Sequence, residues 1–171
     1  MASSTILGLP IEGEPVFPRR DSGIEQWGED KFSELLKPLI ESSRVEAVQW
    51  TQYTPYFNDG DVCEFSVGEA EIKVNDLPEE ANEDAGFHAV YSEWIEGGYR
   101  MRWVRNPTSW GSMYEPYGDP LPEHKDYEAF CALSSAMNRG YFEQFLYDKF
   151  GDHAEVTVYK DRITVECYDH D

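Results

Sequence analysis

The residues best suited to chemistry lie in one short stretch, Trp50 to Asp61, which reads WTQYTPYFNDGD. Asn58, Asp59 and Asp61 offer amide and carboxylate oxygens around a glycine, and calcium or magnesium binds several such oxygens on a flexible turn. The stretch lacks the spaced carboxylates and the closing glutamate of a helix–loop–helix calcium loop. The same residue types also form hairpin turns, because they tolerate positive φ angles. A turn is favoured over a metal site here.

The rest of the sequence carries no recognisable catalytic signature. Neither a dinucleotide-binding glycine pattern nor a lysine-containing phosphate loop occurs. The four histidines show no metal-binding spacing, and the three cysteines fall on strand or helix positions that favour structural thiols: Cys63, Cys131 and Cys167. We therefore predict no catalytic residues and no cofactor, and favour a non-enzymatic protein.

The charge balance is the strongest signal in the composition. The chain of 171 residues has 34 acidic and 14 basic residues, a formal net charge of -20. Such a surface repels nucleic acid and anionic membranes and attracts basic proteins, although acidity alone also favours solubility or reflects a salt-rich habitat. We expect a basic protein partner, no direct contact with nucleic acid and no membrane contact. Three cysteines and no leader pattern favour a cytoplasmic location.

The acidic residues are concentrated in one region. Between Asp61 and Glu96 there are eleven acids against Lys73 alone. Carboxylates along a strand and its following loop could imitate the charge of a phosphate backbone, while neighbouring aromatic side chains anchor a protein partner. The alternative is the solvated outer face of a sheet. The predicted partner-binding residues are Tyr53, Tyr56, Phe57, Asp59, Asp61, Glu64, Glu69, Glu71, Glu79, Glu80, Glu83 and Asp84.

Hydrophobic periodicity predicts the elements that position these residues. Apolar residues at helical spacing predict a helix over 29–41, although Pro38 removes one backbone donor from it. Residues 45–53 are typical of a central strand, and the return strand after the turn shifts parity near Gly68, which predicts a bulge.

The C-terminal part has equally clear patterns. Asp126 can cap a helix that ends at Arg139-Gly140, and a second helix ends before Gly151. Alternating residues then predict a hairpin around Lys160-Asp161.

These elements predict an α+β fold. We expect an antiparallel sheet of four or five strands, built from two hairpins, with two or three amphipathic helices packed on one face. Residues 1–27 are rich in glycine and proline and predict an extended N-terminal arm. Residues 28–171 form the single domain, in which a long acidic, tryptophan-rich loop covers about 76–126. A short strand is expected within that loop at 100–104.

The segment from Val48 to Asp61, continued by Cys63 to Glu69, resembles a segment of small, acidic, uncharacterised phage and bacterial proteins. The resemblance covers about residues 44–74 and brings no catalytic residues. It implies a phage setting, in which small acidic proteins bind and disable host proteins, some of them as DNA mimics. The location would then be the host cytoplasm.

The leading hypothesis is a non-enzymatic acidic protein that binds and inhibits a basic host protein involved in nucleic-acid handling or defence. Two alternatives remain open: a small metal- or ligand-binding enzyme that uses the segment from Tyr53 to Asp61, and a virion or assembly component.

Overall fold

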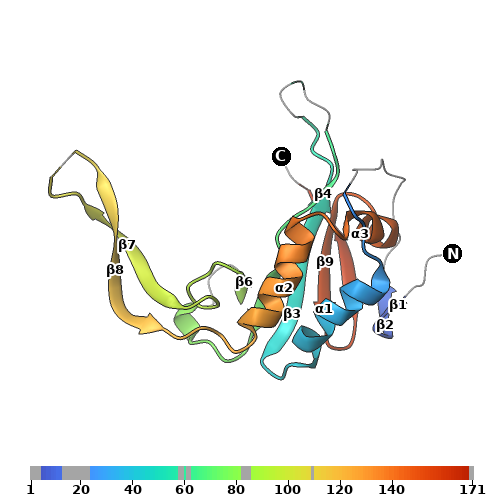
Figure 1. Cartoon of the computed structure of the whole chain (residues 1–171), viewed down its shortest axis with the longest axis horizontal. Helices are drawn as coiled ribbons and strands as arrows, with labels where there is room; N and C mark the ends of the chain where they lie inside the picture. Colours follow the sequence, from blue (N-terminus) through green and yellow to red (C-terminus); the bar gives the residue numbers. More distant parts are fainter. Residues whose placement is uncertain are drawn as a thin grey trace.

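The protein has an α+β fold in which helices cover one face of a sheet, as the sequence predicted (Figure 1). The computed structural model describes residues 5–12, 24–57, 60, 63–81, 86–108 and 110–169. The helices are α1 (Glu29–Glu41), α2 (Tyr127–Asn138) and α3 (Glu143–Phe150), with a short 3-10 turn, η1 (Glu79–Ala81). Among the described residues, none of the helices is long and apolar enough to cross a membrane.

The main sheet has the strand order β1-β2-β10-β9-β3-β5-β6, with β4 also paired to β3. Its strands are β1 (Thr5–Ile6), β2 (Leu9–Glu12), β3 (Val45–Tyr53), β4 (Ser66–Val67), β5 (Glu71–Val74), β6 (Phe87–Ala89), β9 (Ala154–Tyr159) and β10 (Ile163–Cys167). The sequence predicted four or five strands, and the sheet is larger because short strands extend it on both sides. The sequence predicted an antiparallel sheet, and the observed sheet is instead mixed because β2 runs parallel to β10.

Strand β3 is the centre of the core. Trp50 projects toward the helices and makes edge contacts with the rings of Phe32 on α1 and Phe150 on α3, both with centroids 5.7 Å away. Gln52 lies on the same face and is fully buried. Its side-chain amide accepts a hydrogen bond from the Trp50 indole and donates to carbonyls of Leu146 and Gly151. Apolar contact and a satisfied buried amide together join the sheet to α1 and α3.

The bulge that the sequence predicts near Gly68 is present. Gln49 pairs with Glu71 and Gln52 pairs with Val67, so three steps along β3 correspond to four steps on the return chain. The extra residue lies between β4 and β5, where the Gly68 amide donates to the Thr51 carbonyl at 2.7 Å. The extra residue shifts the alternation of side chains by one position. As a result, the apolar residues of β4 and β5 can both point to the faces of the sheet that their pairing with β3 requires.

Two segments differ from the sequence-based expectation. Residues 5–12, within the segment predicted as an extended arm, form β1 and β2 at the edge of the main sheet, where Ile6 is fully buried. Within 76–126, where the sequence predicts mostly loop, β7 (Gly98–Arg105) and β8 (Ser112–Leu121) form a separate two-stranded ribbon. The ribbon extends away from the body of the protein (Figure 1).

The base of the ribbon is attached to the body by a chain of polar side-chain contacts. His124 lies just after β8, and its Nε2 is 2.9 Å from Asp76 Oδ1. Asp126 occupies the N-cap position of α2, as predicted, but its carboxylate makes no cap hydrogen bond. It instead accepts two hydrogen bonds from the Arg44 guanidinium, both at 2.9 Å, and one from Ser42. The Asp126 carboxylate therefore links α2 to the segment between α1 and β3.

Gly68→Ala should lower the free energy of unfolding by about 1–3 kcal/mol, as for overpacking of a filled site. A Cβ at this position would lie 2.9 Å from Thr51 Oγ1 and 3.1 Å from the Thr51 carbonyl oxygen. Urea unfolding measures the loss, with Gly28→Ala as the control because a Cβ there meets nothing within 4 Å. Equal losses in the two variants would contradict the close approach at the bulge.

A double-mutant cycle with Arg44→Met and Asp126→Asn should give a coupling energy of about 1–2 kcal/mol, because the two hydrogen bonds are charge-assisted and Asp126 is largely buried. The free energies come from urea unfolding of the two single variants and the double variant. If Asp126 acted only through its position at the start of α2, the two effects would simply add.

Candidate interaction surface

The face of the sheet turned away from the helices carries a group of glutamates. Because Trp50 and Gln52 point toward the helices, Gln49 and Thr51 point to the opposite face. Pairing then assigns neighbours to that face: Gln49 is opposite Glu71 on β5, and Thr51 is opposite Glu155 on β9. Glu166 on β10 lies directly opposite Glu155. With Glu69 at the bulge, these residues form what we call the acidic face: Glu69, Glu71, Glu155 and Glu166.

A hollow of about 220 Å³ lies in the acidic face. Its lining residues are Gln49, Trp50, Thr51, Glu69, Glu71 and Glu155. The floor is ordered, since the Gln49 amide donates to Thr157 Oγ1 at 3.1 Å and Thr157 is buried. Three carboxylates around one small polar hollow favour a cationic group over an anionic or apolar one.

The pair of Glu155 and Glu166 is electrostatically unfavourable in isolation. Directly opposed like charges on neighbouring strands destabilise a sheet, by the same few tenths of a kcal/mol to about 1 kcal/mol that opposite charges contribute. Within the part of the chain that the structure describes, neither glutamate makes a salt bridge. The repulsion is therefore relieved by solvent, by salt or by a cationic partner.

Glu69 connects the acidic face to the neighbouring helix and loop. Its carboxylate accepts a hydrogen bond from Asn138 Nδ2 at the end of α2, at 3.5 Å. The Tyr91 hydroxyl also hydrogen bonds to Glu69, and this bond, with the nearby negative charge, raises the pKa of Tyr91. The bulge therefore fixes a carboxylate at the edge of the hollow.

The stretch from Trp50 to Phe57 is held against the start of β9. The Thr54 amide and hydroxyl donate to the Asp152 carboxylate at 2.8 and 2.7 Å. The ring of Tyr56 stacks on His153 with centroids 4.8 Å apart, and the ring of Tyr53 contacts Tyr168. Phe57 is 76% exposed and Tyr56 is 72% exposed. This stretch fixes the end of β3 and presents two aromatic side chains to solvent.

The other predicted partner-binding residues are dispersed. Glu64 is exposed in the connection to β4, and Glu79 and Glu80 lie in η1. Glu80 is 3.8 Å from Arg100 on the ribbon, so its charge is directed there. Five predicted residues lie outside the described part of the chain: Asn58, Asp59, Asp61, Glu83 and Asp84. Gly60 has a φ of 97°, which a turn at this point requires.

In the described segments no three His, Cys, Asp or Glu side chains lie close enough together to hold a metal ion. The base of the ribbon contains a second hollow, of about 320 Å³, lined in part by Asp76, Trp94 and His124. Both ring nitrogens of His124 are engaged, because Nδ1 accepts from the Asp126 amide and Nε2 contacts Asp76. His124 is thus placed as a structural link. His88 is also buried, and desolvation lowers its pKa.

Sequence reasoning did not include Glu155 and Glu166 among the partner-binding residues. The alternation of the last hairpin did place both on the face opposite the apolar residues. Their direct opposition depends on the hairpin register, in which Lys160 and Asp161 form the turn and the Tyr159 amide donates to the Arg162 carbonyl. The turn at Lys160-Asp161, which the sequence predicts, was therefore the signal that could have placed Glu155 opposite Glu166.

No protein-family model, curated protein or solved structure matches this chain.

Glu155→Gln should raise the free energy of unfolding by about 0.2–1 kcal/mol at low ionic strength, because it removes the charge opposite Glu166. Glu166→Gln should give a similar gain, and the double variant little more, since either change removes the same repulsion. Urea unfolding at low and high salt measures the effect, which salt should reduce. Glu64→Gln, in an exposed connection, is the control for general charge. An equal gain in that control would argue against specific repulsion.

Proposed function

We propose that this protein is a non-enzymatic interaction protein whose acidic face binds a basic protein partner. The observation that carries the proposal is the convergence of Glu69, Glu71 and Glu155 on one hollow, with Glu166 directly opposite Glu155. The partner class is the one that the net charge of -20 favours, because long-range attraction accelerates encounter with positive surfaces.

The hollow supports a specific form of contact. At about 220 Å³ it is smaller than the pockets that enclose drug-sized ligands, roughly 300–1,000 Å³. A lysine ammonium or an arginine guanidinium fits such a space and donates to several carboxylate oxygens at once. Thr51 and Gln49 supply further polar atoms at its floor. A basic side chain inserted there would also reduce the repulsion between Glu155 and its neighbours.

The sheet lattice suits repeated positive charges. Neighbouring strands are about 4.8 Å apart and same-face residues on one strand about 6.6 Å apart. Carboxylates on this lattice give a dense array of negative charge, which is the property by which a basic nucleic-acid-binding protein recognises a phosphate backbone. Mimicry of DNA is therefore the more specific version of this proposal, and inhibition of the partner its consequence.

The test compares two variants with the same change in net charge. One carries Gln at the four acidic-face positions, and the other replaces four exposed acids on the helices: Glu34→Gln, Glu41→Gln, Glu128→Gln and Asp148→Asn. The probe is a lysine-rich peptide followed by fluorescence anisotropy. The acidic-face variant should bind about tenfold more weakly, since four contacts of a few tenths of a kcal/mol add to roughly 1.4 kcal/mol. The helix variant should bind nearly as well as the native protein.

Salt should weaken binding of the native protein, because the attraction is between exposed charges. Equal weakening by the two variants would show that net charge alone attracts the peptide and would overturn the proposal. A basic DNA-binding domain used as the probe tests the mimicry version: duplex DNA should displace this protein from it, and simultaneous binding of both would exclude mimicry.

A further inference from the structure

The ribbon of β7 and β8 has two chemically different faces. Cross-strand pairing places Arg100 opposite Tyr117, Arg102 opposite Glu115 and Val104 opposite Met113 on one face. The alternate pairs, Met101 with Pro116 and Trp103 with Tyr114, lie on the other face, since successive residues of a strand point to opposite sides. We call the first the arginine face and the second the aromatic face.

Most of the positive charge on the arginine face is paired within the chain, although Arg100 Nε is buried without a hydrogen-bond partner among the described residues. Arg102 donates to Glu115 at 2.6 Å, and the guanidinium of Arg100 lies over the rings of Trp94 and Tyr117 at 5.6 and 5.2 Å. These cation–π contacts and the ion pair order the ribbon along its length and orient it from the body.

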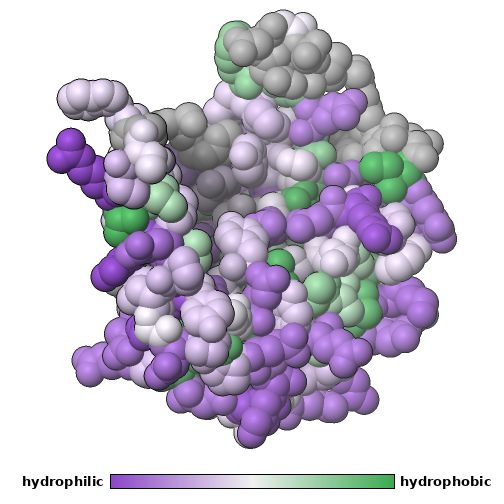
Figure 2. All heavy atoms as spheres, turned by 60° about the vertical axis from the view of Figure 1, so that its left-hand side comes forward, coloured by the Kyte–Doolittle hydropathy of each residue, from purple (hydrophilic) through white to green (hydrophobic). Residues whose placement is uncertain are grey.

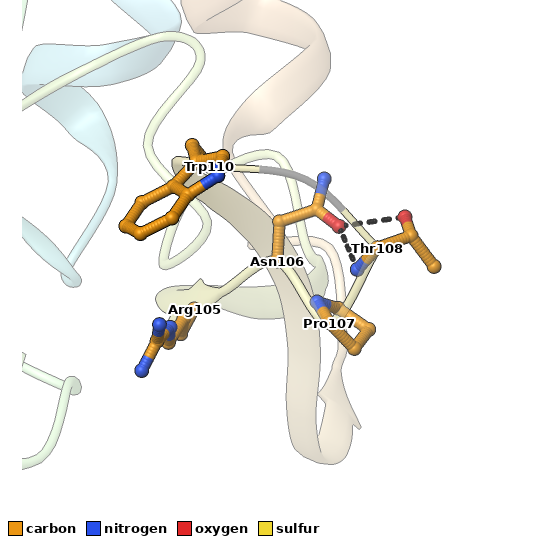
Figure 3. Close-up of a pocket in the computed structure, with 5 residues that line it drawn as sticks. All are labelled: Arg105, Asn106, Pro107, Thr108 and Trp110. Atoms are coloured by element: carbon orange, nitrogen blue, oxygen red, sulfur yellow. Dashed lines mark hydrogen bonds between the residues drawn. The ribbon is translucent and has the colours of Figure 1, made fainter.

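The aromatic face is exposed. Met101 is 49% exposed, Trp103 60% and Tyr114 52%, and the rings of Trp103 and Tyr114 are in contact, with centroids 3.8 Å apart. At the tip, Trp110 is 99% exposed. Figure 3 shows Trp110 and Arg105 on one side of the tip and Pro107 and Thr108 on the other. Since Arg105 follows the alternation of Met101 and Trp103, Trp110 extends the aromatic face.

The size of this face matches an interface. Aromatic side chains bury roughly 150–250 Å² each, so the exposed parts of Trp103, Trp110 and Tyr114, with Met101, amount to on the order of 600 Å². That is the upper end of the largest apolar patch on a typical monomer, about 300–600 Å². It approaches the roughly 800 Å² per partner of a standard interface. Hydrophilic residues predominate on the remaining surface that Figure 2 displays, and its hydrophobic areas are small and separate.

The net charge of the ribbon distinguishes between the possible binding partners of the aromatic face. Residues 98–121 contain three arginines, Glu115 and Asp119, a net charge of +1, so the remainder of the chain carries -21 of the total. A basic partner is attracted to the body and not to the ribbon, and nucleic acid is repelled by the body. A second copy of this chain has the same apolar stripe and the same near-neutral charge at this place.

The projection of the ribbon makes contact between two such acidic chains feasible. Strands of 8 and 10 residues at about 3.3 Å per residue extend roughly 25–33 Å. This is several times the Debye length of about 8 Å at physiological ionic strength. Two copies that meet through their ribbons can keep their acidic bodies beyond the range of strong repulsion.

We propose that the aromatic face packs against the same face of a second copy, in a two-fold symmetric dimer with Trp103 and Tyr114 at its centre. An interface of this kind is self-complementary, since each patch meets its own copy. Tryptophan and tyrosine are the side chains that dominate the centres of protein interfaces. The dimer does not depend on the acidic face and leaves both copies of that face accessible to a basic partner.

The test measures self-association by sedimentation equilibrium, with a monomer mass of 19.7 kDa. Met101→Lys places a charge on the aromatic face beside Trp103, and its matched control is Met113→Lys, the same change at a similarly exposed position on the arginine face. The native chain and Met113→Lys should be dimers at micromolar concentration. Met101→Lys should raise the dissociation constant at least about tenfold, because an unpaired charge becomes buried. Circular dichroism confirms that both variants are folded.

Salt gives the second readout. Salt should strengthen this dimer, since the contact is apolar and the bodies repel, whereas it should weaken the binding of the lysine-rich peptide. A native chain that stays monomeric at micromolar concentration would overturn the proposal. Equal effects of the two lysine variants on the dissociation constant would also overturn it. A dimer that salt weakens would do the same, because ion pairs between the arginines of one copy and the acidic body of the other would then explain association. None of these outcomes affects peptide binding by the acidic face.

Discussion

The buried amide of Gln52 is the contact on which the two layers of the protein depend. It joins the central strand to the end of α3, and its acceptor oxygen orients the Trp50 indole that fills the core between α1 and α3. A buried amide without partners in this position would cost about 1–3 kcal/mol, so the closed core requires the Leu146 and Gly151 carbonyls to stay in place. Trp50 and Gln52 thereby fix which face of β3 is internal and, by alternation, which side chains are external.

The acidic face follows from that choice. Once Trp50 and Gln52 point inward, Gln49 and Thr51 point outward, and antiparallel pairing carries the same face through β5, β9 and β10. The bulge at Gly68 allows the chain from β4 to β5 to keep this register while it places Glu69 beside the hollow. The surface charge is thus arranged by strand register and not by proximity in sequence.

Elements that bury one face were predictable from the sequence. The spacing of Phe32, Leu36 and Leu39 defines α1, and alternation defines the hairpin of β9 and β10, because burial of one face imposes a period on the apolar residues. The ribbon was largely missed because neither of its faces packs on the core. Its apolar residues are exposed, so burial imposes no periodic pattern on them. The opposition of Glu155 and Glu166 requires a pairing register, which the residue pattern of a single strand does not contain.

The acidic face and the ribbon differ in how they can form a contact despite the high net negative charge of the chain. A chain with a net charge of -20 repels other acidic surfaces, so a contact with another protein must either neutralise this charge or keep it at a distance. The acidic face suits the first solution, with a basic partner that supplies the opposite charge. The ribbon suits the second, because it carries a net charge of +1 and extends away from the body (Figure 1). Since salt screens attraction at one surface and repulsion at the other, ionic strength should shift the protein from partner binding toward self-association.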